Sequence, residues 1–380
     1  MKIIDRYVLR QFLQTFVICY VSLTGLYIVF DAFTHLEEFL RASEKTGGLL
    51  PMMASHYLYQ SIAFFDRTAG LLALVAAMFT VSWIQRHNEM TALLSAGISR
   101  IRIVVPVIGA AVVISLLGAA NRELLVPRFR QEISRRPQDV IGDVGKEMQP
   151  RRDNRTDVLI GGKATYAKGQ RIERPKLLLS RLLSPDGRPM SLLAADAYYK
   201  TPTDSRPGGY LLEGVEQPEG LTQQPSLRLG NEPVVITPQD APGWLKPDEC
   251  FLVSDITFEQ LTLGRALRQF SSTAEMISAL RNPSLGFGAD VRVAIHTRIV
   301  NPLLDITLLF LGLPLVVSRE SRNVFIAIGM CICVTAVFLL VVVGFQYLGS
   351  IVWLSPALAA WTPLILFIPP AVWLAESMWQ

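Results

Sequence analysis

Uncharged apolar runs dominate the chain and predict membrane-spanning helices. A helix that crosses a bilayer core about 30 Å thick needs about 20 apolar residues, because lipid offers the backbone no hydrogen-bond partner. Four runs fit one span each: Phe12 to Phe30, Thr68 to Gln85, Ile103 to Asn121 and Ile299 to Ser318. Residues 323–375 are uncharged for longer than one span needs, and Gly, Ser and Pro at 349–356 interrupt them. This stretch predicts two helices and a short turn, which makes six transmembrane helices in all.

A polar segment with a different pattern lies between the third and fourth predicted spans. From Arg122 to Arg292, short apolar runs alternate with turn signals such as Pro185-Asp186-Gly187. Evenly spaced short strands favour a β-sandwich or jelly roll. The expected strands are 157–168, 176–183, 191–200, 209–215 and 232–237. Ser272 and Glu275 have the spacing of a capping box, which predicts a helix that runs to Arg281.

The predicted fold is an α-helical membrane protein with six transmembrane helices and an all-β, jelly-roll-like domain inserted between helices 3 and 4. We expect transmembrane helices 1–3 in residues 1–122, the jelly-roll domain with its terminal helix in 123–290, and helices 4–6 in 291–380. The composition agrees, because 51% of the residues are hydrophobic and only 18% are charged, against roughly 25% charged in soluble domains. The net charge is +4, but its basic residues form no single stripe, which argues against nucleic-acid binding.

The basic residues of the short loops predict the orientation of the chain. They lie before the first span, between the second and third, and between the fourth and fifth: Lys2, Arg6, Arg10, Arg86, Arg100, Arg102, Arg319 and Arg322. All these segments fall on one side of the membrane, and Lys and Arg mark the cytoplasmic side. We therefore expect a multi-pass inner-membrane protein with both termini in the cytoplasm and the β domain in the periplasm.

The polar segment lacks the residues that common catalytic sites need. The four histidines are His35, His56, His87 and His296, all outside it, and its only cysteine is Cys250. Ser-His-Asp and Cys-His catalysis and histidine-rich metal sites are therefore not available there. Gly161-Gly162-Lys163 lacks the spacing of a phosphate-binding P-loop. We expect a non-catalytic protein that binds no metal or cofactor and draws its energy from elsewhere.

The loop between the second and third spans predicts a short surface helix. Residues 86–97 are rich in Ala, Leu and Met, Gly97 suits a helix stop, and Ser99 suits the cap of the next helix. Glu89 lies in its first turn, where the helix dipole favours a solvated carboxylate. The alternative is a docking helix that enters a groove of a cytoplasmic subunit, with Glu89 paired to a basic residue there.

Two charges mark the fourth span. Arg298 and Asp305 are seven residues apart and lie roughly on one helical face. A charge in lipid is costly and needs a partner or a cavity. We expect either a pair with another helix or a place in a lipid-binding cavity.

Three motifs resemble the LptF/LptG permeases of the lipopolysaccharide-exporting ABC transporter. They are Ile4-Asp5-Arg6-Tyr7-Val8-Leu9-Arg10-Gln11-Phe12, Asn88-Glu89-Met90-Thr91-Ala92-Leu93 continuing through Ala96-Gly97-Ile98-Ser99, and His296-Thr297-Arg298-Ile299-Val300-Asn301-Pro302-Leu303 running to Leu311-Gly312-Leu313-Pro314-Leu315. The resemblance covers essentially the whole chain. The family order of three helices, a periplasmic jelly roll and three further helices is also the order read from the hydrophobic pattern.

The resemblance implies a permease subunit that extracts lipopolysaccharide or a related glycolipid from the inner membrane. The partners it implies are a cytoplasmic ABC ATPase dimer that uses the ATP, a second permease of the family or a copy of this chain, and a periplasmic jelly-roll bridge protein. It assigns ATPase coupling to the loop helix, with Glu89, Arg86, Met90 and Leu93 as the predicted contacts.

The positive residues that the family carries at the outer end of the first span are sparse in this chain. Arg41 and Lys45 are the nearest, among several acidic residues. Lipid phosphates need cationic partners, so Arg41, Lys45, Arg298 and Asp305 are the predicted lipid-binding residues, with solvated loop positions as the alternative for the first two.

Rival interpretations are a mechanotransmitting ABC subunit, which would have four spans and a larger outer domain, a membrane-anchored assembly scaffold, and a membrane-embedded enzyme. The sequence leaves open the F or G type, homo- or heterodimer, and the glycolipid.

Overall fold

The computed structural model describes residues 3–46, 48–135, 145–181, 190–204, 206–241, 243–262, 264–317 and 324–376. The chain divides into two compact units. The helical unit comprises Met1–Ser43, Gly47–Ile133 and Gly288–Gln380, and the sheet unit comprises Glu44–Thr46 and Ser134–Phe287. The basic positions Lys2, Arg319 and Arg322 and the turn at 185–187 lie outside the described residues.

Six helices of the described residues are long and apolar enough to cross a membrane, as the hydrophobic pattern predicted. They are α1 (Ile3–Thr34), α3 (Leu49–Arg86), α5 (Arg100–Ala120), α11 (Ala289–Val317), α12 (Val324–Ser350) and α13 (Pro356–Glu376). Most of these helices extend beyond the uncharged runs from which they were predicted. The flanking segments contain Arg, Gln, Leu and Met, which all favour a helix. An uncharged run therefore marks the membrane-embedded part of a helix and not its ends.

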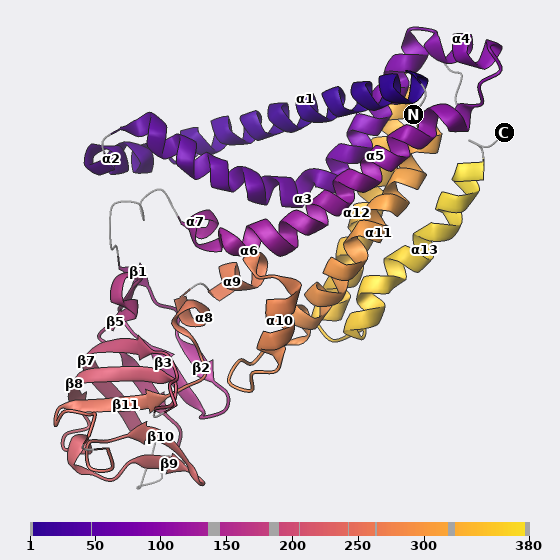
Figure 1. Cartoon of the computed structure of the whole chain (residues 1–380). Coiled ribbons are helices and arrows are strands. Elements are labelled where there is room, and N and C mark those ends of the chain that lie inside the picture. The colour runs from indigo at the N-terminus through magenta and orange to yellow at the C-terminus, as the bar shows by residue number, and fades with distance from the viewer. Residues whose placement is uncertain are drawn as a thin grey trace. The chain divides into compact units, whose positions relative to one another are not determined.

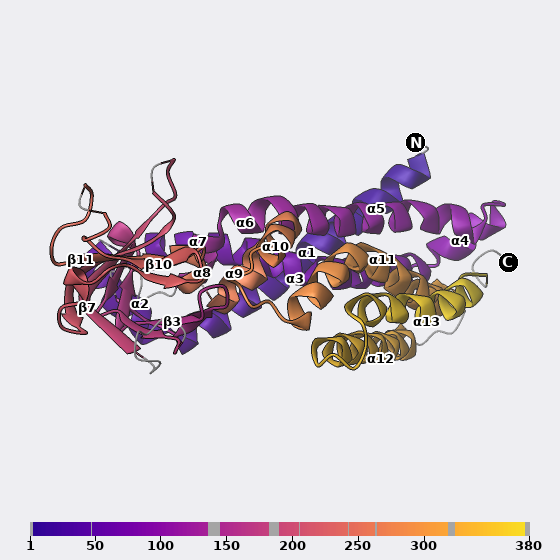
Figure 2. The same cartoon turned by 90° about the horizontal axis from the view of Figure 1, so that it is seen from below.

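The centre of the helical unit is α11, which contacts α3, α5, α12 and α13. In Figures 1 and 2 α11, α12 and α13 (orange to yellow) run side by side. In the most apolar stretch of α11, 56% of the residues are buried, whereas in the corresponding stretch of α1 only 11% are buried. The helix α1 is thus packed on one side, with Val8, Phe12 and Phe16 in the core.

A π-helical turn follows α5. It is η1 (Asn121–Leu125), and α6 (Val126–Arg128) continues it. Pro127 has no N–H for the carbonyl of Glu123, so the α-helical bond pattern cannot continue through this position, and Val126 N bonds to Asn121 O, five residues back. The buried Asn121 also donates from Nδ2 to Ile62 O of α3 at 3.0 Å. This turn sets the position of the next residue, Arg122.

The described residues of the sheet unit form eleven antiparallel strands. They are β1 (Lys146–Glu147), β2 (Arg151–Asp153), β3 (Val158–Gly161), β4 (Ala164–Tyr166), β5 (Arg171–Glu173), β6 (Lys176–Leu179), β7 (Met190–Lys200), β8 (Gly209–Gln217), β9 (Leu227–Leu229), β10 (Glu232–Ile236) and β11 (Glu249–Val253). The main order is β1-β4-β5-β7-β8-β11-β10-β9. The first part of β7 pairs with β6, which continues to β3 and β2, and its second part pairs with β5. The sheet therefore forks at β7, and its core lies among the buried side chains of these strands.

The predicted strand over 157–168 is in fact two strands, β3 and β4. At Gly162, between them, a Cβ would lie 2.5 Å from Ile172 Cγ2, so the close approach of β5 requires glycine there. The predicted helix after Ser272 is confirmed: α10 (Thr273–Leu280) begins with a complete capping box of Ser272 and Glu275. Other short helices are α2 (Leu36–Thr46), α7 (Arg130–Ser134), α8 (Phe258–Thr262) and α9 (Gly264–Phe270).

Candidate functional site

The loop between α3 and α5 contains a helix, but it is shorter than the predicted 86–97. It is α4 (Glu89–Ser95), and Arg86 is the last residue of α3. Asn88 breaks the helix with a left-handed φ of 58°, which Asn tolerates better than most residues. Gly97 ends it at φ 79°, as a helix stop requires. Ser99 occupies the cap position of α5 but makes no side-chain cap hydrogen bond.

One face of α4 is anchored in the core of the helical unit. Met90 is buried, and Leu93, Leu94 and Ile98 pack against the same cluster. The predicted contacts Met90 and Leu93 therefore face this chain's own interior. The opposite face, with Thr91, Ala92 and Ser95, is exposed, as is Arg86.

Glu89 does not project freely from α4. The hydroxyl of Tyr7, 82 residues away in α1, donates to its carboxylate at 2.9 Å from Oε2 and 3.2 Å from Oε1. Tyr7 is 42% exposed and Glu89 is partly exposed, so the contact lies at the surface of the unit. The sequence did not reveal this partner.

A polar cavity of about 240 Å³ lies among α3, α5 with η1, α11 and α12. Its charged and polar lining residues are Asp66, Arg67, Ser115, Arg122, Glu123, Arg298, Asn301 and Asp305. The predicted pair of Arg298 and Asp305 thus lines one cavity, together with two further arginines and two further carboxylates. Charges inside membrane-spanning helices are rare and cluster where a cavity or a partner receives them.

An ion pair in this cavity joins α3 to η1. Arg122 Nε lies 2.7 Å from Asp66 Oδ1, and both side chains are about four-fifths buried, at 21% and 17% exposed. Arg122 also donates from Nη2 to Asp66 O at 3.3 Å. Sequence reasoning missed this pair, yet a signal existed. Asp66 precedes the second predicted span and Arg122 follows the third, so antiparallel packing brings both to one membrane face.

Asp305 joins α11 to α5 deeper in the same cavity. Ser115 donates from Oγ to Asp305 Oδ2 at 2.8 Å. A Cβ at Gly70 would lie 2.3 Å from both Cγ and Oδ1 of Asp305, so the carboxylate occupies the space that a side chain on α3 would fill. Gly70, Ser115 and Asp305 are therefore the close-packed junction of three helices.

The two other predicted lipid-binding residues are Arg41, which does not line this cavity, and Lys45. Both belong to α2, where Arg41 Nη2 lies 3.5 Å from Glu37 Oε2 and both side chains are highly exposed, at 79% and 86%. Such a pair contributes little to stability. The side chain of Lys45 lies outside the described residues.

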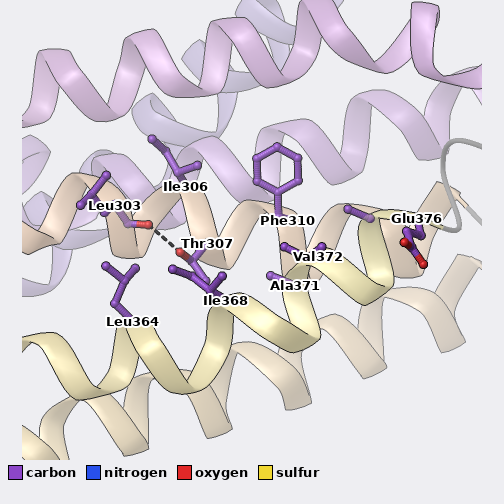
Figure 3. Close-up of a pocket in the computed structure, with 10 residues that line it drawn as sticks. Leu303, Ile306, Thr307, Phe310, Leu364, Ile368, Ala371, Val372 and Glu376 are labelled. Atoms are coloured by element: carbon purple, nitrogen blue, oxygen red, sulfur yellow. Dashed lines mark hydrogen bonds between the residues drawn. The ribbon is translucent and has the colours of Figure 1, made fainter.

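An apolar groove of about 740 Å³ lies between α11 and α13. The residues that line it include Leu303, Ile306 and Phe310 of α11 and Ile368 and Ala371 of α13, which Figure 3 labels. The hydroxyl of Thr307 donates to Leu303 O at 2.8 Å, which satisfies that donor within the helix. Among the residues that the structure describes, Glu376 is the only charged one that lines this groove.

The sheet unit offers no sign of thiol or metal chemistry in its described residues. Cys250 is fully buried in β11, and burial raises the pKa of its thiol to about 12, which leaves it protonated and inert. No group of three or more His, Cys, Asp or Glu suited to a metal ion occurs in the described part of the chain.

The family model for the lipopolysaccharide export system permease LptF/LptG matches residues 6–173 and 215–377. These ranges include α4, the helices around the polar cavity and most of the sheet unit. A search of curated proteins found no match to the chain. A match of this extent shows that the chain belongs to the LptF/LptG family of lipopolysaccharide export permeases.

Proposed function

We propose that the chain is the permease subunit that moves lipopolysaccharide or a related glycolipid out of the inner membrane, driven by a separate ATPase. The observation that carries this proposal is the charged cavity among α3, α5, α11 and α12 in a member of this family. Charged residues within transmembrane helices mark substrate pathways in many membrane proteins.

The lining of the cavity suits the headgroup of a phosphorylated glycolipid. Arginine binds phosphate with two parallel hydrogen bonds, and Arg67, Arg122 and Arg298 supply three guanidinium groups. Asn301 and the carboxylates offer hydrogen bonds to sugar hydroxyls. Because Asp66 holds Arg122 in the structure, the headgroup phosphate would replace that carboxylate when it binds. Arg41 and Lys45 remain further candidate contacts on α2.

The exposed face of α4 is the proposed contact for the cytoplasmic ABC ATPase dimer. Arg86 and Glu89 offer the charges, while Met90 and Leu93 anchor the helix in the core. A short helix with one buried and one exposed face can transmit a push from a partner into the bundle. The ATP belongs to the partner, and this chain binds no cofactor of its own.

The sheet unit forms most of the proposed periplasmic jelly-roll domain, predicted over residues 123–290, with both chain termini in the cytoplasm. Its main strand order ends at β1 and β9, and an open sheet edge accepts a further strand. A periplasmic bridge protein would pair at such an edge, and a second family permease, or a copy of this chain, would complete the lipid path.

Lipid crosslinking tests the role of the cavity. A photoreactive group placed at Leu339, which lines the cavity on α12, should capture lipopolysaccharide. Arg122→Glu and Arg298→Glu should each reduce the captured amount about tenfold or more, since a charge-assisted phosphate contact becomes a repulsion. Arg292→Glu is the matched control, because Arg292 is an exposed residue of α11 that does not line the cavity. Equal capture in all three variants would overturn the cavity as the headgroup site.

Purification separates transport from its rivals. The detergent-solubilised chain should carry an ABC ATPase and lipopolysaccharide, whereas an assembly scaffold would carry neither. The mechanotransmitting alternative predicts four spans, and six helices of the described residues are long and apolar enough to span.

A further inference from the structure

The Tyr7–Glu89 contact joins α4 to α1. On one side is α4, the proposed ATPase contact, and on the other is α1, the helix with the fewest buried residues of the six. The hydroxyl of Tyr7 lies within hydrogen-bond distance of both carboxylate oxygens of Glu89, at 2.9 and 3.2 Å. We infer that Tyr7 is a positioning residue that links α4 to α1, so that a movement of the coupling helix is passed directly to α1. This inference rests on the proposed function of α4.

The contact with Tyr7 differs in kind from the packing that holds α4 in the core. Met90, Leu93, Leu94 and Ile98 are apolar anchors, and apolar contacts are non-directional. They allow a helix to slide or rotate over its neighbours. A hydrogen bond to a charged group has a defined length and direction and is roughly twice as strong as a neutral one. The Tyr7 hydroxyl therefore fixes where α1 lies relative to Glu89.

The helix α1 is suited to carry a displacement along its length. It has 32 residues and is roughly 48 Å long at 1.5 Å per residue. Phe12, Phe16 and Tyr20 stack in succession along one face, with ring centroids 6.4 and 6.5 Å apart. The opposite face is exposed and apolar, as at Val17 and Val21, so no described residue of this chain holds it in place.

A second polar contact ties the far end of α1. The hydroxyl of Tyr57 in α3 donates to Asp31 Oδ2 at 3.0 Å, and His35 Nδ1 lies 3.4 Å from Asp31 Oδ1. A helix held by polar contacts at both ends and by one aromatic face between them transfers a push at Tyr7 to the region of Asp31. The link thus connects the α4 end of the bundle to the α2 end.

Three substitutions separate the link from the ATPase contact. Tyr7→Phe removes the donor hydroxyl and keeps the ring. Glu89→Asp keeps the charge for a basic residue of the ATPase but shortens the side chain by one methylene, out of reach of Tyr7. Tyr20→Phe is the matched control: Tyr20 is also in α1, and its hydroxyl donates to Ser61 O of α3 at 3.0 Å, far from α4.

The experiment uses the full permease with its ATPase in proteoliposomes that contain lipopolysaccharide. We expect Tyr7→Phe and Glu89→Asp to lower the lipopolysaccharide released per ATP hydrolysed about tenfold. The melting temperature of both variants and the ATPase association of Tyr7→Phe should stay as in the wild type, and Tyr20→Phe should release lipopolysaccharide normally. A merely structural role of Tyr7 would lower the melting temperature and ATPase association together.

The possible failures are distinguishable. In one outcome, Glu89→Lys abolishes ATPase association, but Tyr7→Phe and Glu89→Asp release as much lipopolysaccharide per ATP as Tyr20→Phe. The link between Tyr7 and Glu89 is then wrong, and the proposed function stands. If Glu89→Lys also leaves association and release unchanged, α4 is not the ATPase contact and both proposals are wrong. If Tyr7→Phe does not assemble, Glu89→Asp breaks the same contact from the other side and decides the case.

Discussion

At the scale of single residues, Gly70 is a glycine of the helical unit at which an added side chain has no room. A Cβ there would lie 2.3 Å from the carboxyl group of Asp305, whereas a Cβ at Gly109 of α5 would meet nothing within 4 Å. Gly70→Ala should therefore destabilise the protein by about 1–3 kcal/mol through overpacking. Gly109→Ala should stabilise it by up to about 1 kcal/mol, because alanine favours a helix over glycine.

Thermal unfolding in detergent measures both effects. The double variant Gly70→Ala with Asp305→Ala supplies the control, because the smaller partner leaves room for the new methyl group. The cost of Gly70→Ala should then shrink, and the two substitutions should be non-additive. If Gly70→Ala destabilised the wild-type protein and the Asp305→Ala variant equally, a neighbour other than Asp305 would be responsible for the overpacking.

In the sheet unit, the immediate surroundings of Cys250 determine the reactivity of its thiol. It is 0% exposed, and burial raises the pKa of its thiol to about 12, against about 8.5 in an unfolded chain. In a variant with the other three cysteines changed to alanine, an alkylating reagent at pH 8 should label the native protein at least about 100-fold more slowly than the unfolded one. Raising the pH from 8 to 9.5 should speed labelling of the unfolded protein about fourfold, because its thiol passes through its pKa of about 8.5, and the native protein should still react far more slowly because Cys250 is buried. Rapid native labelling at pH 8 would mean that β11 opens to solvent.

At the scale of elements, the sequence predicted what periodicity and composition encode and missed what depends on distant partners. The six apolar helices and the α10 capping box follow from local patterns. By contrast, β11 escaped detection because all five of its residues are buried, so it shows none of the alternation that marks a half-exposed strand. The same limit applies to the site. Asp305 stood out as a charge in an apolar run, but its partners Ser115 and Gly70 are small residues that only helix packing brings to it.

The capping box of α10 allows a direct measurement of such a local signal. Glu275 N donates to Ser272 Oγ at 3.2 Å, and Ser272 N donates to Glu275 Oε2 at 3.0 Å. Ser272→Ala should lower the free energy of unfolding by about 1 kcal/mol, because it leaves a helix N–H without its acceptor. The control is Ser278→Ala, where an exposed hydroxyl bonds back to Glu275 O within the same helix. That change should be neutral or slightly stabilising, and chemical unfolding of the two variants compares them. If Ser278→Ala lowered the free energy of unfolding as much as Ser272→Ala does, the loss of the cap would not be the cause.

At the scale of the whole molecule, the two units make the proposed orientation testable. The helical unit carries α4, which the proposal places in the cytoplasm, and the sheet unit carries the strands, which it places in the periplasm. An odd number of spans separates α4 from the strands in the chain order, since α5 lies between them. If α5 crosses the membrane, the two must therefore be on opposite sides. The absolute direction rests on basic residues such as Arg86, Arg100 and Arg102, which mark a cytoplasmic face.

Cysteine accessibility in intact spheroplasts decides the direction. Ser95 at the end of α4 and Glu219 after β8 are both exposed, so a cysteine at either position should leave the fold intact. In a background whose native cysteines are alanine, a membrane-impermeant maleimide should label Glu219→Cys from outside and should label Ser95→Cys only after the membrane is permeabilised. The reverse pattern would invert the topology and remove α4 from the reach of a cytoplasmic ATPase. Labelling of both from outside would show that α5 does not span, and the transport proposal would then lose the bundle on which it depends.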